Sequence, residues 1–234
     1  MQKYVLITGS LGLVGSESVD FFLKKNFKVI GIDNNKRRFF FGKEGSVNSK
    51  KKLIISNSNY KHYNIDILNF KKIESIFKRF SSEIKLIIHA AAQPSHDWAY
   101  KNPILDFDIN ARATLHLLQC FKKYSSKSTF IFTSTNKVYG DLINNFKLNE
   151  MKTRFEINKK NLFFKKGVSE KFSIDKSVHS FFGSSKTSAD LYVQEFGKNF
   201  NLNTGIFRCG CITGENHAGT EAHGFLNYLT KKIM

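Results

Sequence analysis

The chain has 234 residues, 41% of them hydrophobic, which is enough for one substantial core, and it has no run of about 18 apolar residues that would predict a transmembrane helix. Its formal net charge of +18 does not predict nucleic-acid binding, because only six of the 37 basic residues are arginine and the lysines are scattered. The N-terminus runs directly into a strand, so no secretory leader is expected, and three unevenly spaced cysteines favour a reducing cytoplasm over a disulfide framework.

Strands and helices are predicted to alternate in the first part of the chain. Apolar runs predict strands at residues 4–8, 27–33 and 59–65, and a helix is expected at 14–25. The polar, basic stretch at residues 36–57 predicts a loop or short irregular structure.

The same alternation continues to the end of the chain. Strands are predicted at residues 84–91, 128–134 and 204–208, and helices at 106–123, 182–200 and 225–233. Residues 142–180 predict an insertion, because their central part (144–177) has no clear period and many charges. Apolar strands separated by helices predict an α/β fold: a Rossmann-type, doubly wound parallel sheet with helices on both faces, in one domain over residues 1–234.

Three glycines at the end of the first strand predict a dinucleotide site. Gly9, Gly12 and Gly15 follow the strand directly and open the first helix. Gly9 permits a sharp turn, Gly12 lets the backbone approach a pyrophosphate, and Gly15 lets the helix pack closely on the sheet. The diphosphate is expected at the positive end of that helix. The intervening residues predicted to bind it are Leu11, Leu13 and Val14.

An acidic residue ends the second strand, as such a site requires. Asp33 follows Gly15 by 18 residues, close to the ~20 expected for the carboxylate that binds the adenosine ribose hydroxyls. A carboxylate repels the 2′-phosphate of NADP, so NAD is predicted to be the cofactor. Asn34, next to Asp33, is predicted to contact it. Arginines 37 and 38 are close enough to leave NADP open as the alternative. Asp66 and Ile67 are placed to meet the adenine; the alternative for Asp66 is a helix N-cap.

At this point the chain resembles a known family. The glycine turn, His89-Ala90-Ala91-Ala92 after the fourth strand, Asn110 in the next helix and residues 134–140 (STNKVYG) after the fifth strand are similar to the extended short-chain dehydrogenase/reductase family. Its members are NAD-dependent epimerases and dehydratases of nucleotide sugars. The sequence Thr-Asn-Lys at 135–137 looks most like the CDP-paratose (CDP-tyvelose) 2-epimerase branch, whereas 4,6-dehydratases carry Asp-Glu after the threonine.

The resemblance implies a reaction centre with one departure. In the family, Thr135 hydrogen-bonds the substrate hydroxyl, and a Tyr-x-x-x-Lys pair on the next helix supplies the base and the lysine that holds the nicotinamide ribose. Lys186 is present, but Phe182 stands where the tyrosine belongs. Positions i and i+4 share one helix face, so both reach the same ribose. Phenylalanine has no titratable oxygen, so the usual proton acceptor is missing.

Three interpretations of this departure stay open. Another group takes up the proton, with Tyr139, His179 and Lys137 the candidates near the motif; or the chain binds NAD and nucleotide sugar without turnover; or water and Thr135 alone support slow oxidation. The predicted catalytic residues are Thr135, Asn136, Lys137, Tyr139 and Lys186.

The resemblance also assigns binding residues. Further cofactor contacts are expected from Ala90, Ala91, Ala92, Asn110, Lys186 and Arg208. Substrate contacts are expected from Gln93, Ser95, His96, Thr135, Asn136, Phe182 and His223. The alternative for residues 93–98 is a polar loop packed by Trp98. The spacing of His217, Glu221 and His223 is poor support for a metal, and none is predicted. Cys209 and Cys211 are expected to be small buried side chains.

Relatives in the family continue beyond the Arg-x-x-x-x-x-Gly segment that begins at Arg208. Residues 209–234 are therefore expected to start a substrate-binding region that is truncated here, and residues 142–180 to lie on the substrate side. The family commonly forms homodimers by pairing the helices that correspond to 106–123 and 182–200. The implied partners are a nucleotide sugar and a second copy of the chain, with no nucleic acid or membrane, in cytoplasmic polysaccharide biosynthesis.

Overall fold

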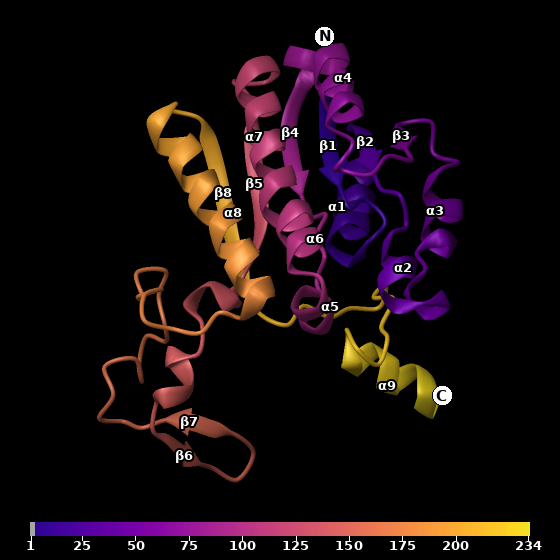
Figure 1. Ribbon diagram of the computed structural model, residues 1–234. Helices are drawn as coiled ribbons and strands as arrows, with labels where there is room; N and C mark the ends of the chain where they lie inside the picture. The colour runs from indigo at the N-terminus through magenta and orange to yellow at the C-terminus, as the bar shows by residue number, and fades with distance from the viewer. Residues whose placement is uncertain (1–2) are drawn as a thin grey trace.

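The computed structural model describes residues 3–234; Met1 and Gln2, which precede the first strand, lie outside them. Six strands form one parallel sheet in the order β3-β2-β1-β4-β5-β8 (Figure 1). The strand order reverses between β1 and β4, where parallel sheets of this type form a crevice at the carboxyl ends of the strands. The predicted Rossmann-type sheet is confirmed. The strands are β1 (Tyr4–Thr8), β2 (Lys28–Ile32), β3 (Tyr60–Tyr63), β4 (Ile84–His89), β5 (Thr129–Thr135) and β8 (Asn203–Cys209).

Nine α-helices lie within the described residues. They are α1 (Leu13–Lys24), α2 (Arg37–Phe41), α3 (Asn48–Ile54), α4 (Phe70–Phe80), α5 (His96–Lys101), α6 (Pro103–Phe107), α7 (Ala113–Tyr124), α8 (Ser180–Asn199) and α9 (Phe225–Ile233). A π-helical turn, Asp108–Arg112, joins α6 to α7, so the three segments form one continuous helix. None of the helices in residues 3–234 is long and apolar enough to cross a membrane.

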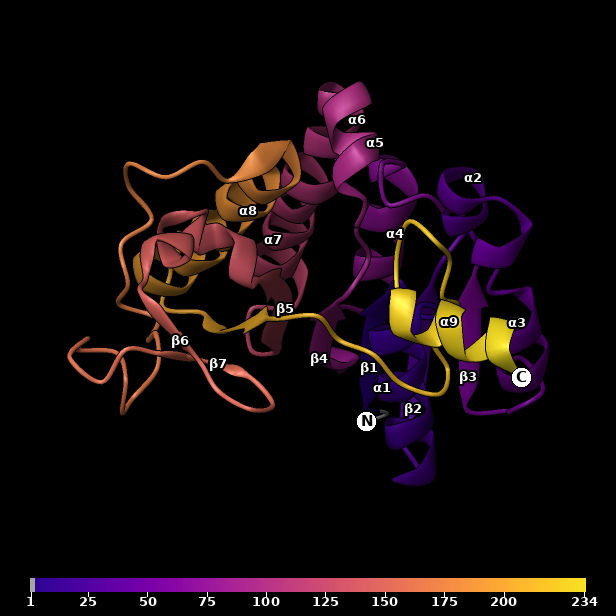
Figure 2. The same cartoon turned by 90° about the horizontal axis from the view of Figure 1, so that it is seen from below.

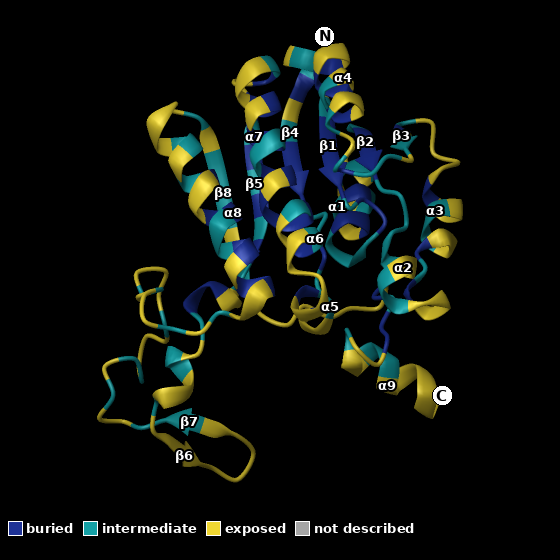
Figure 3. Cartoon of the chain, in the orientation of Figure 1, coloured by how far each residue is buried: buried dark blue, intermediate teal, exposed yellow. Residues whose placement is uncertain are grey.

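Helices cover both faces of the sheet, as expected for alternating apolar strands (Figures 2 and 3). On one face α4, α7 and α8 pack on the strands around fully buried Phe77, Phe121, Phe130 and Phe132. On the other face a smaller core forms where α1 and α3 meet β1 and β2, around residues such as Val19. The central strands are therefore buried, while their carboxyl ends remain free to form a site.

Two regions differ from the predicted elements. Residues 36–57, expected to be irregular, contain α2 and α3, because short apolar faces there pack on the sheet edge through Val47 and Ile54. No element was predicted at residues 66–83, where α4 forms. Its buried residues, Ile73, Ile76, Phe77 and Phe80, follow helical spacing, so the signal was present in the sequence.

The insertion at residues 142–180 extends away from the sheet (Figure 1). It holds a two-stranded hairpin, β6 (Leu148–Glu150) and β7 (Phe155–Ile157), which the sequence did not predict. Phe146, Phe163 and Phe172 stack against one another and give the insertion an aromatic centre of its own.

The segment after β8 crosses below the carboxyl ends of the strands towards α2 (Figure 2). We call residues 210–224 the C-terminal strap. Arg37 on α2 donates from Nη2 to the Ala218 carbonyl oxygen at 2.8 Å, and Asn216 donates to Glu17 on α1 at 2.5 Å. Because these contacts join residues about 180 and 199 positions apart, the strap closes one side of the crevice.

Candidate active site

A cavity of about 610 Å³ lies at the carboxyl ends of β1, β2, β4 and β5, at the reversal of strand order. This is the size of a small-molecule site, and its position is the one such sheets use for ligands. Eighteen of its lining residues were predicted to bind cofactor or substrate: Gly9, Gly12, Leu13, Val14, Gly15, Asp33, Asn34, Asp66, Ile67, Ala90, Ala91, Ala92, His96, Thr135, Asn136, Phe182, Lys186 and His223. Lys137, predicted to be catalytic, lines it as well.

The glycine turn forms a cradle that side chains would fill. Gly9 has φ +66°, and a Cβ there would lie 2.7 Å from the Ala91 backbone nitrogen. A Cβ on Gly15 would collide with the Gly9 carbonyl oxygen. Gly12 caps α1 without a side-chain hydrogen bond, and a Cβ there would meet only the Gly9 carbonyl oxygen, at 3.4 Å. The first N–H groups of this 12-residue helix are therefore open to an anion.

Carboxylates stand at the far side of the cavity. Asp33 accepts hydrogen bonds from the backbone N–H groups of Leu11 (3.0 Å) and Asn35 (2.8 Å), while burial raises the pKa of its carboxyl. Burial also opposes ionisation of Asp66, but hydrogen bonds from Lys36 (2.8 Å) and from Leu68 N–H hold its pKa below the usual value. Asp66 does not cap a helix, because Asn69 caps α4.

Lys186 lies under the opposite end of the cavity. Its side chain is only 3% exposed, its Nζ donates to the Thr133 carbonyl oxygen at 2.7 Å, and it lies 4.0 Å from the centre of the Phe132 ring. Burial lowers the pKa of the ammonium to about 7, against the opposing attraction of Asp190, Cys209 and Asp106.

Polar residues at the end of β5 line the cavity near Lys186, whose Nζ bonds to the same strand. Thr135 Oγ1 accepts a hydrogen bond from the Lys137 backbone N–H at 3.2 Å and lies 3.4 Å from Asn136 Oδ1. No hydrogen bond fixes Lys137 Nζ within residues 3–234. A hydroxyl, an amide and an ammonium thus converge where a polar ligand group can be bound.

Phe182 is buried and lines this end of the cavity. Its ring centre lies 4.9 Å from that of His96, whose Nδ1 is 3.0 Å from Ser180 Oγ. Partial burial lowers the pKa of His96, the charge of Lys137 lowers it further, and Asp97 opposes both.

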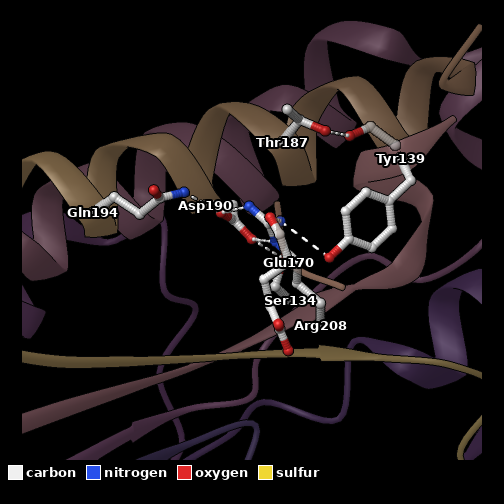
Figure 4. Close-up of polar contacts among 8 residues, drawn as sticks. Ser134, Tyr139, Glu170, Thr187, Asp190, Gln194 and Arg208 are labelled. Carbon is white, nitrogen blue, oxygen red and sulfur yellow. Dashed lines mark hydrogen bonds and ion pairs between the residues drawn. The ribbon is translucent and has the colours of Figure 1, made fainter. Parts of the chain in front are cut away.

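Two of the predicted replacement bases lie outside the cavity. The Tyr139 hydroxyl accepts from Arg208 Nη1 at 3.2 Å and faces a second hollow beside β8 (Figure 4). Both ring nitrogens of His179 lie against carbonyl oxygens, those of Lys137 (3.2 Å) and Ile174 (2.9 Å). Both nitrogens therefore face the backbone, and His179 does not line the cavity.

Arg208 was predicted to bind the cofactor, but it does not line the main cavity. Its guanidinium is held by Asp190, with Nη2–Oδ1 at 2.9 Å and Nε–Oδ2 at 3.0 Å (Figure 4). Ser134 Oγ also donates to that carboxylate at 2.6 Å. The buried acid accounts for the arginine's position, because an unpaired carboxylate there would be costly.

Gln93, Ser95 and Asn110 form a buried network behind the cavity wall. Asn110 Oδ1 accepts from the Gln93 backbone N–H at 2.9 Å, and Asn110 Nδ2 donates to Asp106 at 2.9 Å. Ser95 caps α5, so residues 96–101 are helical rather than a polar loop. These three residues fix the segment that carries His96.

The strap adds residues to the cavity lining. Arg37, with a pKa lowered to about 10 by burial, lines the cavity together with His217 and with His223, whose pKa burial lowers to about 4. Both histidines were expected to contact the diphosphate or the sugar, whereas Arg37 was not predicted to bind. They meet only because the strap returns to α2, which nothing local in the sequence signals. Cys209 also lines the cavity and is partly exposed, and Cys211 is exposed; the prediction that both are buried is wrong. No cluster of three or more potential metal ligands occurs in residues 3–234.

The chain is similar in sequence to known proteins. Residues 5–234 match the NAD dependent epimerase/dehydratase family. The chain is 31% identical over 231 residues to CDP-paratose 2-epimerase of Salmonella typhi, covering 98% of this chain and 63% of that protein. It is 29% identical over 213 residues to dTDP-D-glucose 4,6-dehydratase of Dictyostelium discoideum, covering 90% and 44%.

Solved structures show the same fold. UDP-glucose 4-epimerase of Thermotoga maritima superposes with a TM-score of 0.70 at 23% identity, covering 98% of this chain and 62% of that one. The chain thus spans less than two thirds of the length of these proteins.

Proposed function

The chain belongs to the NAD-dependent epimerase/dehydratase family, and from this premise we propose that it binds NAD and epimerises a nucleotide sugar by transient oxidation of a sugar hydroxyl. The observation that carries the proposal is the pairing of a glycine cradle and Asp33 at one end of a single cavity with Thr135 and Lys186 at the other. The similarity to a CDP-paratose 2-epimerase over 98% of the chain favours that sugar class.

The residues present fit a dinucleotide. The open N-terminus of α1 suits the pyrophosphate, and the tight turn at Gly9 and Gly15 that positions it admits no side chain, because a Cβ at either glycine would collide with backbone atoms. Asp33 suits the adenosine ribose, with Asp66 beside it for the adenine. Lys186 suits the nicotinamide ribose, since its Nζ lies at the level of the β5 carboxyl end.

The chain's own residues then have distinct roles. When bound, NAD⁺ supplies the two-electron acceptor for the sugar carbon. Thr135 Oγ1 orients the hydroxyl to be oxidised, and Lys186, at its lowered pKa, holds positive charge below the reacting centre. Lys137 and Asn136 bind the sugar at the open side. The strap restricts water on the adenosine side through its contact with Arg37.

A second candidate function is NAD and nucleotide-sugar binding without turnover. Phe182 favours it, because it removes the hydroxyl that serves as base in the family. A sugar 4,6-dehydratase is less favoured, since Asn136 and Lys137 stand where that class carries an acid pair.

A homodimer is part of the proposal. Large side chains outside the core are exposed within the two segments that pair in the family, residues 106–123 and 182–200: Phe107, Leu191 and Tyr192. Such a surface is typical of a protein–protein contact.

Turnover is the direct test. Purified protein loaded with NAD⁺ is incubated with CDP-paratose, and the sugar products are separated and identified. We expect CDP-tyvelose to form with no net consumption of NAD⁺. Absence of any isomer from CDP-, UDP- and dTDP-sugars with protein shown to contain NAD would overturn the epimerase and leave the binding function.

Replacing Asp33 by alanine is expected to weaken NAD binding about 10- to 100-fold, because charge-assisted hydrogen bonds to the ribose are each worth about 1.5–3 kcal/mol. Lys36 and Arg37 remain nearby, so NADP binding is expected to weaken much less. Calorimetric titration of both cofactors measures this. Asp20→Ala, whose carboxylate pairs with Lys50 away from the cavity, is the control. Equal losses for NAD and NADP would contradict the assignment.

A further inference from the structure

The replacement of a tyrosine by Phe182 leaves a gap in the proton chemistry of the site. Oxidation of a secondary alcohol breaks one C–H and one O–H bond. The C–H hydrogen leaves with its electron pair to NAD⁺, and the O–H proton must pass to a base. The Phe182 ring lies at the cavity wall and cannot accept it.

Most alternatives are already engaged. Tyr139 and His179 lie outside the cavity, as described above. The Cys209 thiol lies 3.4 Å from the Phe207 carbonyl oxygen as a hydrogen-bond donor, and burial raises its pKa. Lys186 is almost fully buried and already donates to Thr133. Lys137 lines the cavity, but an ammonium group carries donors and no acceptor. One imidazole at the reacting end, that of His96, is left as an acceptor.

We propose that His96, through Nε2, accepts the proton of the sugar hydroxyl in place of the missing tyrosine, a role that rests on the proposed epimerase function. His96 lines the same cavity as Thr135 and Lys186, and its ring lies 4.9 Å from the Phe182 ring. Nδ1 has a partner in Ser180, whereas Nε2 has no hydrogen bond to any residue of the described chain. The imidazole thus presents its free nitrogen on the side where the tyrosine hydroxyl is absent.

Ser180 is the positioning residue. It begins α8 with φ +62°, a left-handed conformation that a non-glycine residue rarely adopts. In this conformation its hydroxyl accepts from the Gly183 N–H at 3.2 Å and lies 3.0 Å from His96 Nδ1. In the tautomer in which Nδ1–H donates to that oxygen, Nε2 carries the lone pair. Ser95 caps α5 directly before His96 and fixes its backbone.

The charges around His96 suit a proton acceptor. Lys137, from the turn after β5, faces it, as does His223 from the strap, and Asp97 follows it on α5. Partial burial and Lys137 lower the pKa of His96, so the neutral form prevails at pH 7. The reaction is therefore expected to slow as the pH falls through a value below 6.5.

Three variants test the role. His96→Gln is expected to lower kcat about 100- to 10,000-fold, the usual worth of a general base. Adding Phe182→Tyr to His96→Gln restores the missing hydroxyl and is expected to recover at least about tenfold of that loss. His116→Gln, at a histidine on α7 that contacts the Phe70 carbonyl oxygen away from the cavity, is the matched control and retains wild-type kcat. His96 is exposed at the start of α5, so all variants are expected to fold, and melting temperatures verify this.

A second readout does not depend on turnover. The Cε1–H resonance of His96 in NAD⁺-loaded protein, assigned by its loss in His96→Gln, is followed against pH. We expect the pKa of His96 to lie below 6.5 and to coincide with the pH at which the wild-type rate falls on the acid side. In the His96→Gln/Phe182→Tyr variant we expect this fall in rate to occur at a different pH. A resonance that stays protonated at pH 8 would overturn the proposal.

The outcomes separate this role from the epimerase function. Wild-type activity retained in His96→Gln overturns the role of His96 and leaves the epimerase. Activity in Phe182→Tyr but not in wild type shows that no replacement base exists, which also overturns it. If no variant, including Phe182→Tyr, turns over any nucleotide sugar, the epimerase function itself fails and this role falls with it.

Discussion

Replacing Arg208 by methionine is expected to lower the free energy of unfolding by about 3–5 kcal/mol, the usual cost of removing one partner from a buried ion pair. Asp190 is only 1% exposed and accepts two hydrogen bonds from the guanidinium, at 2.9 and 3.0 Å. Ser134 and Gln194 also donate to it, so α8, β5 and β8 meet at this carboxylate. Without the arginine, a buried negative charge stays on the helix that carries Phe182 and Lys186.

Urea unfolding at pH 7 measures the effect. Arg154→Met is the matched control, since that arginine pairs with Glu156 on the exposed hairpin and its loss costs at most about 1 kcal/mol. Arg208 and Ser134 hold the pKa of Asp190 below its usual value despite burial, so the pair's contribution is full at neutral pH and is lost only as the pH falls below about 4. A loss under about 1 kcal/mol in Arg208→Met would contradict this account.

Local sequence signals predicted the cofactor end of the site. The glycine turn, Asp33 and the three alanines after β4 can each be recognised within a short segment, because each follows a strand directly in the sequence. The parallel sheet followed from apolar strands separated by helices. The helices α2, α3, α4 and α5 and the β6–β7 hairpin were not predicted, and for α2 and α3 the reason is that their apolar faces are short.

Long-range contacts account for what the sequence could not predict. The sequence around Arg208 does not show whether its guanidinium binds a cofactor or a carboxylate of the protein. Only the fold brings Asp190 beside it. Tyr139 is close to Thr135 in sequence, yet the turn after β5 directs its hydroxyl to the second hollow. His96 lies 86 residues before Phe182, and its ring reaches that site only because α5 packs at the start of α8.

Replacing Lys186 by methionine is expected to lower kcat/KM about 100- to 1,000-fold, the usual worth of one preorganised charge at a reacting centre. The variant is also expected to be at least as stable as wild type at pH 7, because the buried ammonium opposes folding. Its pKa is lowered from 10.5 to about 7, so the unfolded chain binds this proton between those values while the folded chain does not. The wild type therefore loses stability as the pH falls through that window.

Between pH 10 and pH 7 the free energy of unfolding of the wild type is expected to fall by about 4 kcal/mol because of this buried charge. The same decrease is expected to be absent in Lys186→Met. Urea unfolding of the cofactor-free protein at both pH values gives the difference, with exposed Lys198→Met on the same helix as control. An equal pH dependence in wild type and variant would show that Lys186 is not destabilised by burial. Arg208 and Lys186 are both buried cations next to α8, yet their loss is expected to change stability in opposite directions. The difference lies in the partner: Arg208 has a carboxylate, whereas Lys186 has a carbonyl oxygen and an aromatic ring until the cofactor's ribose arrives.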